Sequence, residues 1–233
     1  MVHPGDVLQL QNHCYVRSVH TDGTRIVSGG DDTMVRVWSF SDGNTPRMLA
    51  AHTGKVNAVQ LTPDGSHLVS ASDDGDIRVW RVADGRNVRT LSVNSTVLSV
   101  HVTADGAHII SGSGDHKLRV WSFTDGSAVL VQKGHSSGIS AVHANAQHVV
   151  SGSGDRTVRM WSFGTGALLQ VFKGHTNQVL SVQLTPDGSR VVSGSADTTV
   201  RIWRVADGSC AHTLHGHSGL VFTVHMTADG AQP

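Results

Sequence analysis

Five tryptophans recur along this 233-residue chain at nearly constant intervals, at positions Trp38, Trp80, Trp121, Trp161 and Trp203. The intervals are 42, 41, 40 and 42 residues. A period of about forty residues is typical of repeat proteins, in which each unit is one supersecondary motif that buries its apolar face against the next. The period therefore predicts a domain of stacked units, and it argues against an enzyme organised around one catalytic pocket.

Each tryptophan closes the same short motif. Residues 149–161 read VVSGSGDRTVRMW, and residues 191–203 read VVSGSADTTVRIW. An aspartate stands six residues before every tryptophan, at Asp32, Asp74, Asp115, Asp155 and Asp197. A Gly-His pair or a close variant occupies residues 51–52, 134–135, 174–175 and 216–217. These motifs resemble the repeats of WD-repeat β-propellers, and the resemblance covers nearly all of the chain.

The period also has a physical interpretation. Each unit contains four short runs of apolar and β-branched residues separated by Asp-Gly or Ser-Gly turns, which predicts antiparallel hairpins. In the fifth unit these runs are 179–184, 190–194, 199–204 and 210–214. We therefore expect an all-β propeller of four-stranded blades, with five complete blades and the first strand of a sixth. The expected units are approximately 1–40, 41–82, 83–123, 124–163, 164–205 and a partial unit at 206–233.

The polar motif residues have a structural interpretation. In the family, a His, Ser, Asp and Trp of one blade form a hydrogen-bonded tetrad. The resemblance implies three such sets: His52, Ser70, Asp74 and Trp80; His135, Ser151, Asp155 and Trp161; and His175, Ser193, Asp197 and Trp203. A Ser–His–Asp set also resembles a hydrolase triad, but a triad needs an exposed nucleophile and an oxyanion hole. Repetition of the set from blade to blade favours the structural role.

Two units depart from this pattern. Ser92-Val93 replaces the Gly-His pair that would serve Asp115. We therefore expect Asp115 to be less well hydrogen-bonded, at a cost on the order of 1–3 kcal/mol. In the first unit His13 stands one residue out of register. The Asp that usually follows the family's tryptophan is replaced by Ser or Arg in all five units.

A longer period lies within the short one. Trp38 to Trp161 and Trp80 to Trp203 both span 123 residues, and units two and five share the strings LTPDGS and WRVADG. This indicates that three blades were duplicated as a block. Residues 7–13 align with the outer strand at 129–135, whereas the C-terminal part offers only Val221–Thr227 as an inner strand. We therefore expect a truncated ring that completes as six or seven blades.

Six polar residues occupy one equivalent position in the first strand of each unit: His20, Gln60, His101, His143, Gln183 and His225. The first strand is innermost in a propeller, so these side chains are expected to form a ring near the central channel. The ring either lines the channel with water-bonded polar groups or forms an anion, metal or pH-sensitive site. Five arginines precede the tryptophans by two residues and are expected to stack as structural residues: Arg36, Arg78, Arg119, Arg159 and Arg201.

Composition excludes several classes of function. Eighteen basic residues balance 18 acidic ones and no basic run exists, so nucleic-acid binding by charge is not expected. No apolar stretch is long enough to cross a membrane. Cys14 and Cys210 do not make a disulfide framework, which favours a cytoplasmic protein, with the nucleus also compatible. No chelate spacing is present, and we expect no metal, cofactor or small-molecule substrate.

The resemblance implies a rigid platform for other proteins or peptides rather than an enzyme. In the family, partners often contact the face that carries the d–a and b–c loops, where d, a, b and c name the strands of a blade with a innermost. The candidate residues on that face are Tyr15, Arg17, Asp31, Lys55, Asn57, Asp73, Leu98, Leu180, Leu220 and Phe222.

In a six-blade ring, Tyr15, Leu220 and Phe222 would lie on neighbouring blades and form one apolar patch, with Asp31 and Asp73 adding negative charge. This favours a partner with an apolar anchor and a basic flank. The alternative is that these aromatics fill the unfinished seam. Two other functions remain open, namely a small-molecule or catalytic site in the channel, and an architectural segment of a larger protein.

Overall fold

The structure is a computed structural model that describes residues 14–40 and 46–226. These residues form five four-stranded antiparallel sheets, which are called blades 1 to 5 in chain order. The strands are β1 (Val16–Thr21), β2 (Arg25–Gly30), β3 (Val35–Ser39), β4 (Arg47–Leu49), β5 (Val56–Leu61), β6 (His67–Ser72), β7 (Asp76–Arg81), β8 (Asn87–Ser92), β9 (Val97–Val102), β10 (His108–Ser113), β11 (Lys117–Ser122), β12 (Ala128–Lys133), β13 (Ile139–Ala144), β14 (His148–Ser153), β15 (Thr157–Ser162), β16 (Leu168–Lys173), β17 (Val179–Leu184), β18 (Arg190–Ser195), β19 (Val200–Arg204) and β20 (Cys210–Leu214). The predicted all-β fold of four-stranded blades is confirmed. The described ranges contain no helix that is long and apolar enough to cross a membrane.

The turns follow from their residues. In the hairpin between β5 and β6, Gly65 takes a φ of +66°, which glycine adopts without a Cβ clash, and its N–H donates to the Thr62 carbonyl over 2.8 Å. The Asp64 carboxylate accepts a bond of 3.0 Å from the Ser66 N–H, so that the aspartate side chain closes the same turn. In the fifth unit, β17 and β20 have the predicted bounds, and β18 and β19 differ from prediction by one residue each.

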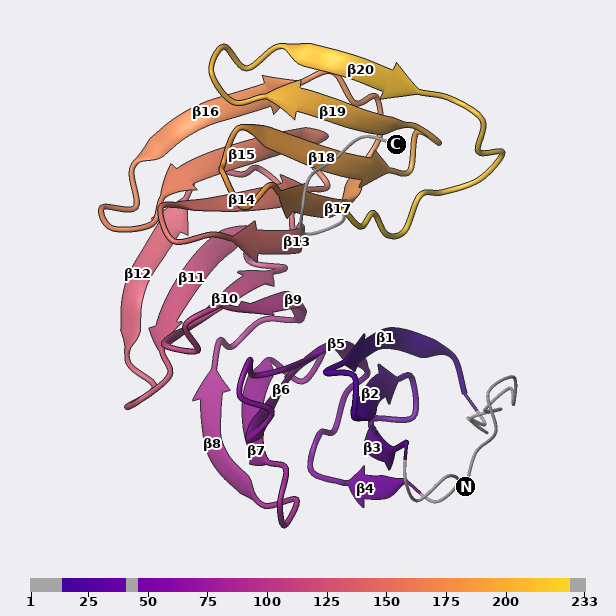
Figure 1. The fold of residues 1–233 in the computed structure, drawn as a ribbon, viewed down its shortest axis with the longest axis vertical. Coiled ribbons are helices and arrows are strands. Elements are labelled where there is room, and N and C mark those ends of the chain that lie inside the picture. Colours follow the sequence, from indigo (N-terminus) through magenta and orange to yellow (C-terminus); the bar gives the residue numbers. More distant parts are fainter. Residues whose placement is uncertain (1–13, 41–45, 227–233) are drawn as a thin grey trace.

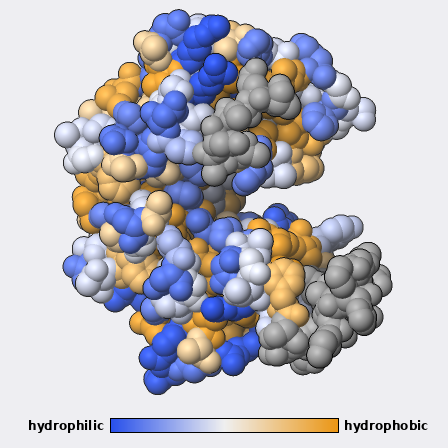
Figure 2. Space-filling view, in the orientation of Figure 1, coloured by the Kyte–Doolittle hydropathy of each residue, from blue (hydrophilic) through white to orange (hydrophobic). Residues whose placement is uncertain are grey.

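The blades are arranged side by side in an open arc (Figure 1). Within each blade the four strands are hydrogen-bonded to one another in chain order. The first strands of successive blades pack against one another in the order β1, β5, β9, β13 and β17. The outer strands β4, β8, β12, β16 and β20 lie on the convex rim (Figure 1). The arc is open between blade 1 and blade 5, and apolar surface lies on both sides of the opening (Figure 2).

The expected first strand of a sixth blade is present only in part. Residues 221–226 lie against blade 5, where the Val221 N–H donates to the Ser195 carbonyl over 3.1 Å and its side chain is buried. This segment is not a β-strand, because within the described residues it has no second strand to pair with. The predictions for residues 7–13, His13 and Thr227 fall outside the described residues.

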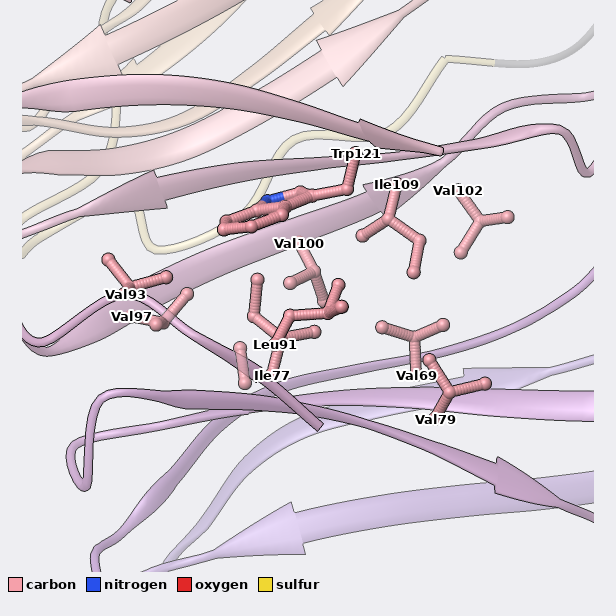
Figure 3. Packing of buried hydrophobic residues seen from close by; sticks show 11 residues of the cluster. Val69, Ile77, Val79, Leu91, Val93, Val97, Val100, Val102, Ile109 and Trp121 are labelled. Atoms are coloured by element: carbon pink, nitrogen blue, oxygen red, sulfur yellow. The ribbon is translucent and has the colours of Figure 1, made fainter. Parts of the chain in front are cut away.

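The core lies between blades rather than inside each one. In Figure 3, Val100, Ile109 and Trp121 of blade 3 face Val69, Ile77 and Leu91 of blade 2. Both faces of blades 2, 3 and 4 are covered in this way, which explains why their central strands read as nearly continuous apolar runs. The packing between blades therefore holds the polar motifs in place at the loop ends. It also holds the ring of first-strand residues along the inner side of the arc.

Candidate functional site

In three blades the structure brings the predicted tetrad residues together. In blade 2, His52 Nδ1 lies 2.8 Å from the Asp74 carboxylate, and His52 Nε2 lies 2.8 Å from Ser70 Oγ. The Trp80 indole N–H donates to the same Ser70 oxygen over 2.8 Å. One relay therefore runs from indole to hydroxyl to imidazole to carboxylate, and every member has a partner.

Blades 4 and 5 repeat this geometry. The corresponding imidazole-to-carboxylate distances are 2.8 Å for His135–Asp155 and 2.7 Å for His175–Asp197. Ser151 and Ser193 accept the indole N–H groups of Trp161 and Trp203 over 2.9 Å in both blades. A neighbouring backbone N–H, from Ser136 or Thr176, also donates to the carboxylate.

The electrostatics of these sets are those of a structural network. Burial lowers the pKa of His52, His135 and His175 despite the adjacent carboxylates, so the imidazoles stay neutral. Burial alone would raise the pKa of Asp155, but hydrogen bonds from Thr157 and His135 lower it to about 2. The serines Ser70, Ser151 and Ser193 are fully buried. Because no substrate can reach these hydroxyls, the three sets do not have the geometry of hydrolase triads.

Blade 3 contradicts the expectation for Asp115. The missing histidine is replaced by Arg119, whose guanidinium makes bonds of 3.0 and 2.5 Å to the two Asp115 oxygens. Ser113 Oγ donates a further bond of 2.5 Å, and Lys117 Nζ lies 3.4 Å away. Burial opposes ionisation of Asp115, but these donors hold its pKa well below the ordinary value. The prediction of a poorly bonded carboxylate was wrong, because an arginine two residues before the tryptophan reaches the same oxygens.

In blade 1 an arginine likewise bonds to the aspartate. Arg36 donates to Asp32 over 3.2 and 2.5 Å, and the Trp38 indole N–H lies 3.5 Å from Ser28 Oγ. The predicted stacking role of the arginines holds for Arg201, whose guanidinium carbon lies 5.8 Å from the centre of the Trp203 ring. Arg36 and Arg119 serve mainly as ion-pair partners instead.

The charged candidates on the loop face pair with one another. Arg17 of β1 bonds to the Asp31 carboxylate, and Lys55 Nζ lies 3.4 Å from the same group. Arg17 first and Lys55 second hold the pKa of Asp31 below its ordinary value. In blade 2 the Asn57 amide donates to Asp73 over 2.7 Å and to the Val97 carbonyl of blade 3 over 3.0 Å.

The apolar candidates differ in accessibility. Leu98 of β9 and Leu180 of β17 are half-buried. Tyr15 is 83% exposed, Phe222 is 70% exposed and Leu220 is 50% exposed. Tyr15 precedes β1 and the other two follow β20, so they stand at the two ends of the open arc (Figure 1). Tyr15 thus belongs to blade 1, and Leu220 and Phe222 belong to the segment that follows blade 5.

The six residues of the predicted ring line one cavity of about 750 Å³ on the inner side of the arc. The rings of His101 and His143 are 4.4 Å apart between centroids. Burial, followed by the neighbouring His143, lowers the pKa of His101 to about 3. Burial likewise lowers the pKa of His143 to about 4.

The structure also reveals bonds between blades that sequence reasoning missed. The backbone N–H of Val59 donates to Ser18 Oγ of the preceding blade over 3.1 Å, and Val142 and Val224 donate in the same way to Ser99 and Ser181. The sequence does carry a signal for these bonds, because a serine precedes the central valine of the first strand in units one, three and five. These bonds satisfy one inner-edge N–H group in blade 2, one in blade 4 and one in residues 221–226, where no described strand lies further inside.

Radial four-stranded blades with a Trp–Ser–His–Asp relay define a repeat protein of the β-propeller class. The family model described as "WD domain, G-beta repeat" matches residues 6–39, 43–81, 85–122, 126–162 and 166–204. The chain belongs to this WD-repeat family. Repeats of this family generally mediate protein–protein interactions.

Two curated relatives match shorter segments. Cilia- and flagella-associated protein 52 of Chlamydomonas reinhardtii is 39% identical over 46 residues, which cover 20% of this chain and 8% of that protein. The DENN domain and WD repeat-containing protein SCD1 of Arabidopsis thaliana is 36% identical over 56 residues, which cover 24% of this chain and 5% of that protein. The matched segment thus spans less than a tenth of either relative.

Proposed function

We propose that this chain is a non-catalytic scaffold that binds a partner protein or peptide on the face carrying the d–a and b–c loops. The proposal rests chiefly on the exposed aromatic residues Tyr15 and Phe222. Large aromatic side chains lose apolar contact with water when a partner covers them, and they are common anchors of protein interfaces. Leu220, beside Phe222, would extend the second anchor.

The charge pattern narrows the kind of partner. Asp31 is already paired with Arg17 and Lys55, so it contributes little unbalanced negative charge. Asp73 is exposed, and among the described residues its carboxylate accepts a side-chain bond from the neutral Asn57 amide alone. A basic group of the partner would therefore pair with Asp73. The half-buried Leu98 and Leu180 would line the surface between the anchors rather than insert into the partner.

The balance of 18 basic and 18 acidic residues supports a protein partner over a nucleic acid or an anionic membrane. Both Cys14 and Cys210 are free thiols. This supports a reducing compartment, and we place the protein in the cytoplasm or nucleus as part of the proposal.

The test is affinity capture followed by mass spectrometry with the parent chain and a Tyr15→Ala/Phe222→Ala double variant. We expect the parent to retain a set of partners that the double variant loses, because each substitution removes an exposed aromatic anchor. Circular dichroism must show the same β-sheet signal for both chains.

The matched control is Val129→Ala/Leu169→Ala on the outer strands β12 and β16, where both side chains are about as exposed as Leu220. This control should retain the partners. Equal capture by the parent and the Tyr15→Ala/Phe222→Ala variant would refute the proposed anchors. Loss with the outer-strand control instead would place the interface on the rim.

A further inference from the structure

Four of the ring side chains that line the cavity on the inner side of the arc accept a hydrogen bond from the backbone that follows them around the arc. The backbone N–H of Val102 donates to Gln60 Oε1 over 3.0 Å, and that of Met226 donates to Gln183 Oε1 over 2.6 Å. The N–H of Leu61 donates to His20 Nδ1 over 3.4 Å, and that of Leu184 donates to His143 Nδ1 over 3.3 Å. Four of the six ring residues therefore share one bonding pattern.

This bonding pattern determines which hydrogen-bonding atoms of the four side chains are left to face the cavity. A backbone N–H can only donate, so the atom that faces it must be an acceptor. Each glutamine consequently uses its carbonyl oxygen on the next blade and keeps its NH₂ group for the cavity. Each neutral imidazole accepts at Nδ1 and must carry its proton at Nε2. Gln60, Gln183, His20 and His143 thus direct N–H donors to the cavity, while the acceptor atom of each already bonds to the next blade.

The donors are unpaired and uncharged. Among the residues that the structure describes, no protein acceptor bonds to these four N–H groups. Burial lowers the pKa of His20 and His143, so both rings are neutral at pH 7. The same tautomer argues against metal binding, because one imidazole nitrogen accepts a backbone bond and the other carries a proton. Within the described ranges no group of three or more His, Cys, Asp or Glu residues is arranged to hold a metal ion.

We propose that this donor ring, made of His20, Gln60, His143 and Gln183, binds a small oxyanion. An oxyanion such as sulfate offers only acceptors and so complements the N–H donors that these four side chains direct to the cavity. Hydrogen bonds from neutral groups to an anion are stronger than those between two neutral groups. The cavity volume of about 750 Å³ leaves room for the ion together with water.

One carboxylate lies at the edge of the cavity, that of Asp22. It accepts bonds of 2.8 Å from the Thr24 and Arg25 N–H groups, and the Arg25 guanidinium lies 3.7 Å away. Its charge is therefore directed into its own turn and balanced by Arg25. The other charged or titratable groups that face the ring are His101 and His225.

The experiment is a side-chain ¹⁵N NMR titration of the full chain at pH 7 with sodium sulfate, against sodium chloride at equal ionic strength. Melting temperature alone would not serve, because sulfate stabilises most folded proteins by exclusion from their surfaces. We expect the Nε2-protonated tautomer for His20 and His143 and saturable sulfate-dependent shifts of their Nε2–H signals and of the Gln60 and Gln183 NH₂ signals. Phosphate should compete for the same signals.

Two substitutions separate binding from structure. Gln183→Glu keeps an oxygen for the Met226 N–H but replaces the NH₂ donor by a second oxygen, so it should weaken sulfate binding at least about tenfold. Gln60→Glu serves the same purpose if Gln183→Glu does not fold. His143→Gln keeps both an acceptor and a donor, as blades 2 and 5 do naturally, and should retain binding. Nδ1-protonated rings, shifts equal to those in chloride, or unchanged binding by a folded glutamate variant would overturn the proposal.

Discussion

At the scale of single residues, the aspartate that precedes each tryptophan is stabilised by one of two kinds of partner. Each blade places an aspartate at a tight turn near the loop face, where burial disfavours its charged form. Blades 2, 4 and 5 supply a neutral histidine, whereas blades 1 and 3 supply an arginine from the third strand. An ion pair that has lost one partner leaves an uncompensated charge, so the arginine blades depend more strongly on a single side chain.

Arg119→Met should therefore destabilise the protein by on the order of 1–3 kcal/mol, because Asp115 loses two charge-assisted bonds. The matched control is Arg159→Met in blade 4. There the guanidinium stands 3.9 Å from Asp155, which His135 already holds, so the loss should be smaller. Urea unfolding gives both free energies, and equal losses in the two blades would contradict the assignment.

His143 predicts a pH dependence of stability. Burial and then His225 lower its pKa from 6.5 to about 4, so the folded state binds its proton less tightly than the unfolded state does. The stability that the neutral His143 ring contributes is therefore fully present above pH 6.5. As the pH falls from 6.5 towards 4, the free energy of unfolding decreases by up to roughly 3 kcal/mol. The variant His143→Gln cannot be protonated and should show a shallower decline of the unfolding free energy over this window. A decline as steep as in the parent would assign the effect to other groups.

The sequence predicted which residues form the tetrads, but it did not predict which side chain replaces the histidine in blade 3. The spacing of Asp74, Trp80 and His52 repeats a known motif, so their meeting in blade 2 could be anticipated. Nothing in the string Ser92-Val93 shows that Arg119 turns towards Asp115, because that depends on the space left by the missing imidazole. The position of Tyr15 relative to Phe222 also lay beyond sequence reasoning, since it depends on the geometry of the whole arc.

At the scale of elements, the blades are joined where the first strand of one contacts a glycine in the second strand of its neighbour. A methyl group added at Gly152 of β14 would lie 2.6 Å from Val179 Cγ1 and 2.9 Å from Val182 Cγ1, both on β17. The same position in β6 is Ala71, which is fully buried. The sequence predicted the strands well, but it does not say which blades tolerate a methyl group, because this depends on how closely two blades approach.

Gly152→Ala should consequently destabilise the protein by about 1–3 kcal/mol through overpacking against Val179 and Val182. The control is Gly164→Ala in the turn after β15, where an added methyl group meets nothing within 4 Å. That change should stay within about 0.5 kcal/mol of the parent. Thermal or urea unfolding distinguishes the two, and a neutral Gly152→Ala would mean that blades 4 and 5 can separate slightly at no cost.

At the scale of the whole molecule, the open arc leaves half of a blade contact uncovered. Val56 and Val59 of β5 pack against blade 1 and are 0% and 5% exposed. The equivalent residues of β1, Val16 and Val19, are 42% and 58% exposed. The equivalent pair of Val or Ile followed by Val is buried at the other blade contacts, whereas in β1 it faces solvent at one end of the arc, beside an inner strand edge that no described strand pairs with.

This surface should make the chain self-associate as its concentration rises, because the exposed valines lose contact with water when a second molecule covers them. The variant Val16→Lys/Val19→Lys places two charges on that surface and should shift the association to markedly higher concentration, as measured by sedimentation equilibrium. Val129→Lys/Val131→Lys, on the similarly exposed outer strand β12, controls for the added charge and should associate like the parent. If the two variants behave alike, net charge rather than the uncovered blade contact governs association, and the end of the arc is not the adhesive surface.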